Sequence, residues 1–284
     1  MNNKPTAATS DKLNITLIGC GNMGGAMLRG WLKAGIINKA YIYTRSGIAE
    51  DLQHNAYIEN FTDTATLQQN LGASDLLTLA VKPQGMAALM DEIGTTIPKT
   101  LPVMSVAAGL SQNFFSKYIG MDHPFIRVMP NTPSAIGRGM SGAYASPSVH
   151  PTSKAAVNAL LSAIGHYIWV EDEAQIDAVT AVSGSGPAYI FHFIEALTAA
   201  AKSIGFDDTS ATALARQTVI GAAALANAQP DIDAATLRKN VTSPGGTTEA
   251  GLKVLMEHDP VNLEELLTET VKAAEQRGKE LGKA

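Results

Sequence analysis

Short apolar runs alternate with helix-length stretches from Leu13 to about residue 171. Several of these runs are continuously apolar, which is typical of strands that are covered on both faces. The strands predicted are Asn14–Ile18, Ala40–Tyr43, Leu76–Ala80, Pro102–Val106 and Phe125–Val128, with weaker candidates at Ala143–Ser146 and Tyr167–Val170. Because helix-length segments separate them, we expect a doubly wound α/β domain with a parallel sheet.

The pattern changes around residues 171–173: no convincing strand follows, and alanine becomes the most frequent residue. Helices are predicted at Gln175–Val182, Ala188–Ile204, Ser210–Ala226, Ala234–Lys239, Thr248–Glu257 and Asn262–Glu280. The last helix carries one apolar stripe from Leu263 to Ala274. Because small side chains let helices approach closely, we expect an all-α C-terminal domain that forms a dimer interface. The predicted division is a flexible tail at 1–12, the α/β domain at 13–171 and the helical domain at 172–284.

Composition narrows the classes of function. The 284 residues are 45% hydrophobic and 17% charged, which is enough apolar material for a core. A net charge of −5 disfavours a bulk electrostatic hold on nucleic acid or anionic lipid. The one cysteine, Cys20, allows no intrachain disulfide and fits a reducing compartment. From the cysteine and the charge we expect a cytoplasmic protein that acts on a small molecule, and no apolar segment is long enough to span a bilayer.

The first predicted strand runs into a GxGxxG sequence that opens a helix, Gly19-Cys20-Gly21-Asn22-Met23-Gly24. In such a loop Gly19 allows the tight turn, Gly21 lets the backbone approach a pyrophosphate, and Gly24 lets the helix pack on the strand. The amides at the helix start, which include those of Asn22 and Met23, favour phosphate groups. The loop therefore predicts a dinucleotide cofactor, with a merely tight turn as the alternative.

The end of the second strand indicates which cofactor is preferred. A site specific for NAD usually places an acidic residue there, about 20 residues after the glycines, to hold the ribose hydroxyls. Here the sequence is Tyr43-Thr44-Arg45-Ser46, without an acid. Arg45 and the hydroxyl of Ser46 suit a 2′-phosphate, because arginine forms charge-assisted bonds to phosphate. We expect NADPH to be preferred and NADH to be possible, the alternative being an arginine in a solvated loop.

Three further segments follow strands at the same edge of the sheet, where ligands of open parallel sheets lie. They are Ala80-Val81-Lys82-Pro83, the segment around Ala107, and Met129-Pro130-Asn131-Thr132-Pro133. We expect the first two to border the nicotinamide half of the cofactor. Lys82 is either catalytic or, as we favour, a ligand of phosphate or water. Two prolines around Asn131 fix a rigid turn, which favours a binding wall.

Two segments of the helical part differ from ordinary connections. Ser183-Gly184-Ser185-Gly186-Pro187 interrupts a helical pattern, and it either stops a helix or exposes backbone to a ligand. The second, from Thr242 to Glu249, places glycines and hydroxyls at a helix start. The free amides of Gly246 and Thr247 suit a carboxylate there, although a simple capped helix start fits the composition equally well.

Other chemistries are not indicated. The six histidines are scattered, and His192 with Glu195 makes only two ligands, so no metal site is expected. No Ser/His/Asp order or nucleophile elbow is present. We therefore expect the cofactor to supply the chemistry.

The motifs together resemble the pyrroline-5-carboxylate reductase family over residues 13 to 280. In chain order they are the GxGxMG loop, AVKPQ, SVAAG, RVMPNTP, AVSGSGPAY and VTSPGGTT. The resemblance implies reduction of 1-pyrroline-5-carboxylate to L-proline with NAD(P)H, in the last step of proline synthesis. It also implies a Rossmann-like N-terminal domain and a helical domain that interlocks in a dimer, which family members commonly assemble further into decamers.

The resemblance also assigns roles to individual residues. The segment formed by Ser243, Gly245, Gly246, Thr247 and Thr248 would line the substrate pocket, with backbone amides and Ser243 on the carboxylate. Thr248 would lie near the imine nitrogen, and we expect it to position or relay the proton, so that it is the catalytic residue. Whether Thr248 or water donates the proton stays open.

One position departs from the family pattern. Many members have Asn near the adenosine, where this chain has Asp63. Asp63 is either a helix cap or an unfavourable neighbour of a phosphate. Two rival interpretations remain, another reductase such as a β-hydroxyacid dehydrogenase or imine reductase, and a nucleotide-binding regulator without catalysis.

Overall fold

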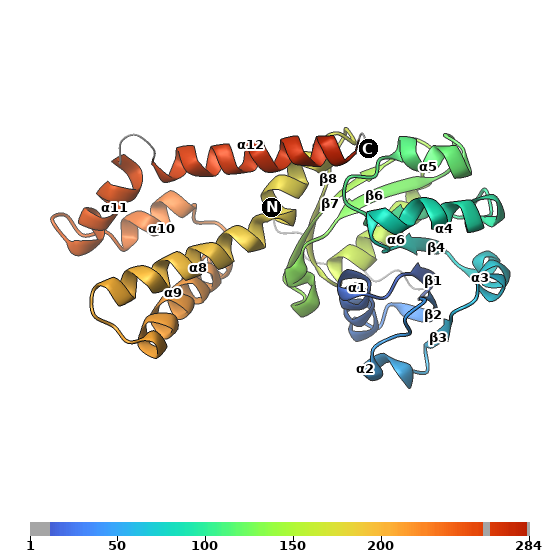
Figure 1. The fold of residues 1–284 in the computed structure, drawn as a ribbon, viewed down its shortest axis with the longest axis horizontal. Helices are drawn as coiled ribbons and strands as arrows, with labels where there is room; N and C mark the ends of the chain where they lie inside the picture. Colours follow the sequence, from blue (N-terminus) through green and yellow to red (C-terminus); the bar gives the residue numbers. More distant parts are fainter. Residues whose placement is uncertain (1–11, 258–261, 283–284) are drawn as a thin grey trace. The chain divides into compact units, whose positions relative to one another are not determined.

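The computed structural model describes residues 12–257 and 262–282, in two compact units (Figure 1). The first unit comprises residues 1–185 and 274–284, and the second comprises residues 186–273. Residues 1–11 of the predicted tail lie outside the described residues. The chain thus leaves the first unit after Ser185, somewhat later than the change in sequence pattern near residue 171.

The first unit contains one eight-stranded sheet with the order β3-β2-β1-β4-β5-β6-β7-β8. Its strands are β1 (Leu13–Ile18), β2 (Ile37–Tyr43), β3 (Ile58–Phe61), β4 (Leu76–Leu79), β5 (Val103–Ser105), β6 (Phe125–Met129), β7 (Gly139–Ala145) and β8 (Gly165–Trp169). All neighbouring strands are parallel except β6 and β7, which pair antiparallel. The predicted doubly wound α/β domain is confirmed, with one antiparallel pair in its sheet.

Strand β3 was not predicted, and its burial explains why. It lies at the edge of the sheet, and only Phe61 of its four residues is buried. A short, mostly exposed strand shows no apolar run in the sequence. The strands β1, β4 and β5, which the apolar runs did predict, are almost entirely buried.

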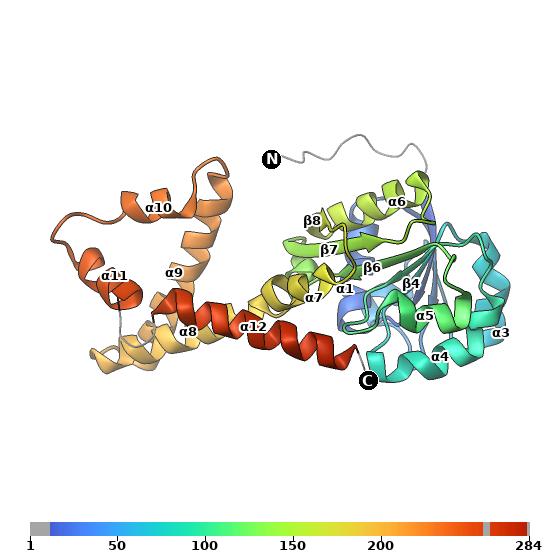
Figure 2. The same cartoon turned by 90° about the horizontal axis from the view of Figure 1, so that it is seen from above.

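Helices cover both faces of the sheet and bury a separate apolar cluster on each (Figure 2). They are α1 (Asn22–Lys33), α2 (Glu50–Gln53), α3 (Thr64–Asn70), α4 (Met86–Ile93), α5 (Gln112–Ile119), α6 (Pro151–Ser162) and α7 (Gln175–Val179), with short 3-10 turns η1 (Leu71–Ala73), η2 (Pro83–Gly85), η3 (Gly94–Thr96) and η4 (Thr132–Ile136). One cluster contains Trp31 of α1 and Leu160 of α6, and the Trp31 Nε1 donates to the Leu160 carbonyl at 2.9 Å. The other contains Leu67, Leu89 and Phe115 from α3, α4 and α5. Helices therefore pack on both faces of the sheet that carries the glycine loop.

Helix α7 continues into a π-helical turn, η5 (Thr180–Gly184), where a single helix was predicted. After it come α8 (Gly186–Ser203), α9 (Asp208–Ala228), α10 (Ala234–Asn240), α11 (Thr247–Glu257) and α12 (Leu263–Leu281), whose last residues belong to the first unit. No strand occurs among the described residues after Trp169, as predicted. Asp207 and Asp233 cap α9 and α10 through the amides of the first turn.

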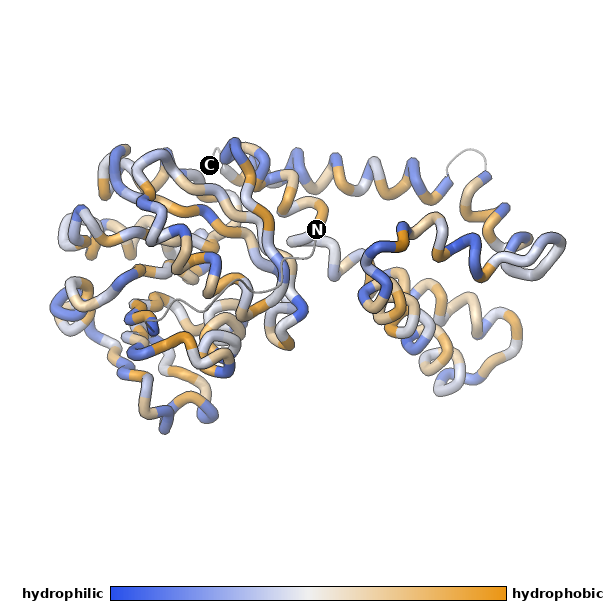
Figure 3. The backbone as a smooth tube through the Cα atoms, turned by 180° about the vertical axis from the view of Figure 1, so that it is seen from behind, coloured by the Kyte–Doolittle hydropathy of each residue, from blue (hydrophilic) through white to orange (hydrophobic). Residues whose placement is uncertain are grey.

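The second unit has almost no core of its own. Among its described residues only Ala211 and Ala215 are buried in the single chain, whereas Phe191, Ile220 and Leu266 are at least half exposed. The hydropathy colouring of Figure 3 shows apolar segments along these helices as well as on the strands of the first unit. No helix among the described residues is long and apolar enough to cross a membrane.

Candidate functional site

The glycine loop joins β1 to α1 in a conformation that only glycine allows at two positions. Gly19 has φ +92°, and a side chain there would lie 2.8 Å from the Ala80 carbonyl oxygen. A side chain on Gly24 would collide with the Gly19 carbonyl, so α1 packs directly on the turn. Gly21 faces open space and precedes α1 without any side-chain cap. The first amides of α1 are therefore left for an external acceptor such as phosphate.

A hollow lies over this loop at the carboxyl ends of β1, β2 and β4. It is lined by Ile18, Gly19, Cys20, Gly21, Tyr43, Thr44, Arg45, Ser46, Ala80, Val81, Lys82, Gly85 and Leu89. Seven of the residues predicted for the cofactor lie together in this wall: Gly19, Gly21, Arg45, Ser46, Ala80, Val81 and Lys82. Their convergence creates a concave site at the edge of the sheet where ligands of such folds bind.

Arg45 lies at the outer end of the hollow. Its side chain is 71% exposed, and its Nη2 lies 3.6 Å from the Glu92 carboxylate. The hydroxyls of Thr44 and Ser46 are 3.5 Å apart beside it. Since exposed ion pairs contribute little stability, Glu92 holds Arg45 only weakly and leaves it available to an anion.

The inner wall contains the segment that follows β4, whereas the residues that follow β5 do not line the hollow. Lys82 is exposed and precedes η2, whose first residue is Pro83. Ala107 is 5% exposed, and its amide donates to the Ser105 hydroxyl at 3.3 Å. Neither Pro83 nor Ala107 lines the hollow, and neither do Asn22, Met23 and Gly24. Lys82 is thus the charged residue among those after β4 that line the hollow.

Asp63 and Cys20 have ordinary structural environments. Asp63 caps α3 by accepting from the amide and hydroxyl of Thr66, and these bonds lower the pKa of its carboxyl. Burial raises the pKa of the Cys20 thiol, which disfavours the reactive thiolate. The helix-cap interpretation of Asp63 therefore has direct support.

Asn131 is buried and engaged within the protein. Its Nδ2 donates to the Ser183 carbonyl at 2.9 Å, and its Oδ1 accepts from the Met140 amide at 2.8 Å. It does not line the hollow. The rigid turn predicted between Pro130 and Pro133 is present, but it holds η5 in place.

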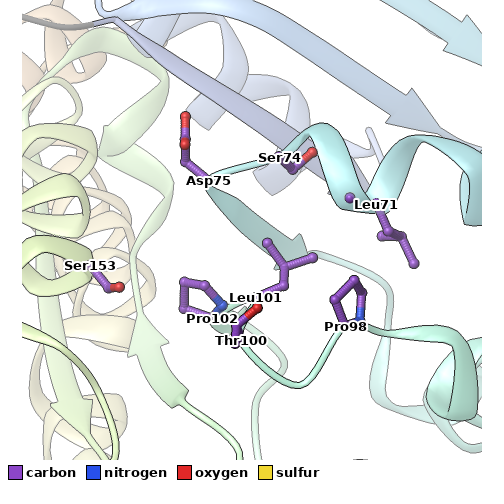
Figure 4. A pocket seen from close by; sticks show the side chains of 9 residues that line it. Leu71, Ser74, Asp75, Pro98, Thr100, Leu101, Pro102 and Ser153 are labelled. Atoms are coloured by element: carbon purple, nitrogen blue, oxygen red, sulfur yellow. The ribbon is translucent and has the colours of Figure 1, made fainter.

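A second hollow of the first unit lies at the opposite end of the sheet (Figure 4). It is lined by Leu71, Gly72, Ser74, Asp75, Pro98, Thr100, Leu101, Pro102 and Ser153. These residues border the amino ends of β4 and β5, far from the strand ends at which ligands of this fold bind. It is therefore not a candidate for the cofactor.

The turn predicted to bind substrate belongs to the second unit and connects α10 to α11. Gly245 has φ +70°, which suits glycine, and α11 begins at Thr247. Ser243, Thr247 and Thr248 are exposed in the single chain. The amides of Thr247 and Thr248 are in the first turn of α11, where no intrahelical acceptor exists.

Two of the amides in this turn have partners within the protein. Gly246, whose amide we expected to be free, donates to the Ser243 carbonyl at 3.0 Å. The Gly245 amide donates to the Glu249 carboxylate at 2.7 Å. The groups left for a carboxylate are thus the Ser243 hydroxyl and the amides of Thr247 and Thr248.

Metal chemistry finds no support among the described residues, where no three His, Cys, Asp or Glu side chains gather as ligands. His192 lies 3.1 Å from Glu195 on the exposed face of α8, as a surface pair. Sequence reasoning did not assign Ile18, Gly85 and Leu89 to the cofactor wall. Leu89 is 3% exposed, so its helical spacing indicates only a core position.

Comparison with known proteins places both units in one family. Residues 173–281 match the family described as "Pyrroline-5-carboxylate reductase dimerisation". Residues 14–109 match the family described as "NADP oxidoreductase coenzyme F420-dependent". A pyrroline-5-carboxylate reductase of Pseudomonas aeruginosa is 37% identical over 270 residues, covering 94% of this chain and 96% of that protein.

Solved structures give the same result. One from Coxiella burnetii, described as a pyrroline-5-carboxylate reductase, is 35% identical with a TM-score of 0.88, covering 96% of this chain and all of that one. A Plasmodium falciparum pyrroline carboxylate reductase with NADP bound is 27% identical with a TM-score of 0.79, covering 96% of this chain and 99% of that one.

Proposed function

The chain belongs to the pyrroline-5-carboxylate reductase family, and we propose that it reduces 1-pyrroline-5-carboxylate to L-proline with a reduced nicotinamide dinucleotide, as the last step of proline synthesis. The observation that carries the proposal is that its resemblance to named reductases extends over both units. A regulator that only binds nucleotide would need the first unit alone.

The glycine cradle supports a nicotinamide dinucleotide as cofactor. The space at Gly21 and the uncapped start of α1 suit the pyrophosphate, with the amides of Asn22 and Met23 as donors and Gly24 as the packing position. On the inner side, Ala80, Val81 and Lys82 line the hollow, and Pro83 and Ala107 shape the segments behind it. When bound, the cofactor supplies the hydride.

NADPH is the preferred cofactor in this proposal, with NADH accepted less well. Arg45 and Ser46 are placed to hold a 2′-phosphate, because a guanidinium forms charge-assisted bonds to phosphate oxygens. Lys82 binds phosphate or water at the inner end. Asn131 serves the site through its position, since its carboxamide is already engaged.

The substrate presents a ring C=N bond and a carboxylate, and the turn before α11 suits the carboxylate. The Ser243 hydroxyl and the Thr247 and Thr248 amides are the donors, while Gly245 and Gly246 shape the turn. Positioning of this kind can contribute about 7–11 kcal/mol to lowering a barrier. The hydride adds to the imine carbon as the nitrogen gains a proton, which Thr248 relays or positions through its hydroxyl.

The helical unit forms a homodimer in this proposal. The family match over residues 173–281 and the exposed apolar side chains of α8, α9 and α12 support it. Further assembly of dimers into a decamer, as family members commonly show, is part of the same proposal. The protein acts in the cytoplasm, a location to which its single cysteine is suited.

An absorbance assay tests the proposal. The purified protein is mixed with NADPH and 1-pyrroline-5-carboxylate, and loss of the reduced-cofactor band is compared with chromatographic detection of proline. Reactions with a β-hydroxyacid plus oxidised cofactor, or with an acyclic imine, separate the rival reductases. Proline formed in step with NADPH loss is expected. Binding of NADPH without turnover of any of these substrates would instead support the regulatory rival.

A further inference from the structure

The turn η5 is the last element before the chain enters the second unit. Its Ser185 amide donates to the Thr180 carbonyl at 2.8 Å, the i to i−5 bond of a π-helix. Ser185 ends the first unit and Gly186 begins the second. Such turns inside helices often mark functional positions.

Proline at position 187 removes a donor that the helix would otherwise use. In an α-helix the amide four residues on donates to each carbonyl, and for Ser183 that residue is Pro187, which has no N–H. Asn131 supplies a donor instead, since its Nδ2 lies 2.9 Å from the Ser183 carbonyl oxygen. The Asn131 side chain thus replaces the backbone hydrogen bond that η5 lacks at Ser183.

The orientation of the Asn131 carboxamide is fixed from its other end. The Met140 amide donates to Oδ1 at 2.8 Å, so Nδ2 must be the atom that faces Ser183. The side chain is buried, at 8% exposure. Asn131 is therefore a rigid link between the start of β7 and η5.

Residues of β6 also contact α7 and η5. Arg127 of β6 is 5% exposed, and its Nη2 lies 2.7 Å from the Asp177 carboxylate of α7. A side chain on Gly184 would lie 2.9 Å from the Met129 Cε, so η5 packs closely on the last residue of β6. Arg127 and Asn131 thus fix the two ends of the α7–η5 segment.

We propose that Asn131 is a positioning residue for the reduction, which fixes η5 by replacing the hydrogen bond that Pro187 cannot donate. The inference rests on the proposed function, because it assigns the cofactor to the first unit and the substrate turn to the second. The segment at η5 is one of two covalent connections between them, the other being in α12. Hydride transfer is sensitive to small misplacements of the reacting groups.

The experiment uses four single variants and two double variants of the full chain. Asn131→Asp keeps the size and the acceptor for Met140 but removes the donor to Ser183, and Asn131→Ala removes both bonds. Pro187→Ala restores a backbone amide opposite the Ser183 carbonyl and is combined with each. Asn158→Ala is the matched control, because it removes a comparable bond, from Trp169 Nε1 at 2.8 Å, elsewhere in the first unit.

For each variant, kcat, both KM values, the NADPH dissociation constant and Tm are measured. Asn131→Asp and Asn131→Ala should lower kcat about tenfold and leave the NADPH dissociation constant within about twofold. Pro187→Ala should recover most of that loss in the double variants and change kcat by less than about twofold alone. Asn158→Ala should lower Tm with kcat unchanged.

Three results would overturn the inference. Weaker NADPH binding at unchanged kcat would make Asn131 a cofactor ligand. A loss of kcat that Pro187→Ala does not relieve, or that Asn158→Ala reproduces, would make its role merely structural. An unmodified protein that forms no proline would refute the proposed function and the positioning role with it. In that case, non-additive changes in Tm between the Asn131 and Pro187 variants would still test the hydrogen bond to Ser183.

Discussion

The two units of this chain bury their apolar residues to very different extents. The first has two apolar clusters, one on each face of its sheet, with Trp31, Phe115 and Phe125 almost completely buried. The second buries only Ala211 and Ala215 among the residues that the structure describes, although its helices carry many large apolar side chains. Both units have well-formed helices, so the exposed apolar residues of the second do not result from a lack of secondary structure.

The difference shows which unit has a full apolar core within a single chain. Burying a large apolar side chain contributes about 1.5–3 kcal/mol, so a few such residues against a second copy stabilise an interface. Large exposed apolar surfaces mark interaction sites in stable proteins. The hollow proposed for the cofactor belongs to the unit with its own apolar clusters, while the turn proposed for the substrate belongs to the unit whose apolar side chains are exposed.

The largest effect is expected from a charge placed in the exposed apolar surface of the second unit. Phe191→Asp should dissociate the oligomer and lower turnover by at least about 100-fold, because the carboxylate would be buried unpaired at the interface. Sedimentation velocity and the proline assay measure both. Met121→Asp changes an exposed apolar residue of the first unit, and it should alter neither; an active oligomer of the Phe191 variant would remove α8 from the interface.

Thr248→Ala tests the chemistry of the second unit. Loss of one hydrogen bond made in the transition state costs about 2–4 kcal/mol, so kcat should fall roughly 30- to 1000-fold. The NADPH dissociation constant should stay unchanged, because the cofactor hollow lies in the first unit. Thr268→Ala on α12 is the control, and a normal turnover number for the Thr248 variant would exclude it from the mechanism.

Ser243→Ala should act on substrate affinity. A hydrogen bond to a charged group contributes about 1.5–3 kcal/mol, so the KM for 1-pyrroline-5-carboxylate should rise at least tenfold. Steady-state kinetics with each substrate varied separates this from an effect on NADPH, with Ser203→Ala as control. Weaker NADPH binding at an unchanged imine KM would mean that the turn serves the cofactor.

Arg45→Ala tests the outer end of the cofactor hollow in the first unit. Loss of a charge-assisted bond should raise the KM for NADPH by about tenfold and that for NADH by less than about twofold. Lys99→Ala removes an exposed positive charge elsewhere in this unit and should change neither constant. Equal changes for both cofactors, or none, would show that Arg45 does not contact a 2′-phosphate.

The smallest effect concerns the pH dependence of the first unit. Burial lowers the pKa of His123 below its ordinary value of 6.5, and its Nε2 lies 2.8 Å from the Leu101 carbonyl. The unfolded chain then binds the proton more readily, so stability falls as pH drops through about 6.5. Calorimetry between about pH 7.5 and 5.5 should show a Tm decrease of a few degrees that is reduced in His123→Gln; an equal decrease in both proteins would exclude His123 as the cause.

The sequence predicted the buried parts of the fold and the cofactor loop, since both depend on local pattern. Strands β1, β4 and β5 are short, largely apolar runs that are almost entirely buried, and neighbouring atoms leave no space for a side chain at Gly19 or Gly24. Strand β3 was missed because it is short and mostly exposed.

Features that depend on contacts between distant segments were not predictable. The bond between Asn131 and Ser183 joins residues 52 positions apart, and no sequence spacing reveals it. Likewise, the acceptors of the Gly245 and Gly246 amides depend on how the turn before α11 closes. The roles of Ser243 and Thr248 came from the family resemblance, since the residues alone fit a simple helix start.

Sedimentation equilibrium of the unmodified protein, with the proline assay run on the same samples, tests the difference between the units most directly. At micromolar concentration the protein should sediment with at least twice the mass of one chain, and dilution that dissociates it should remove activity in parallel. A folded monomer that forms proline at the full rate would contradict the account, because its second unit would then function without a partner.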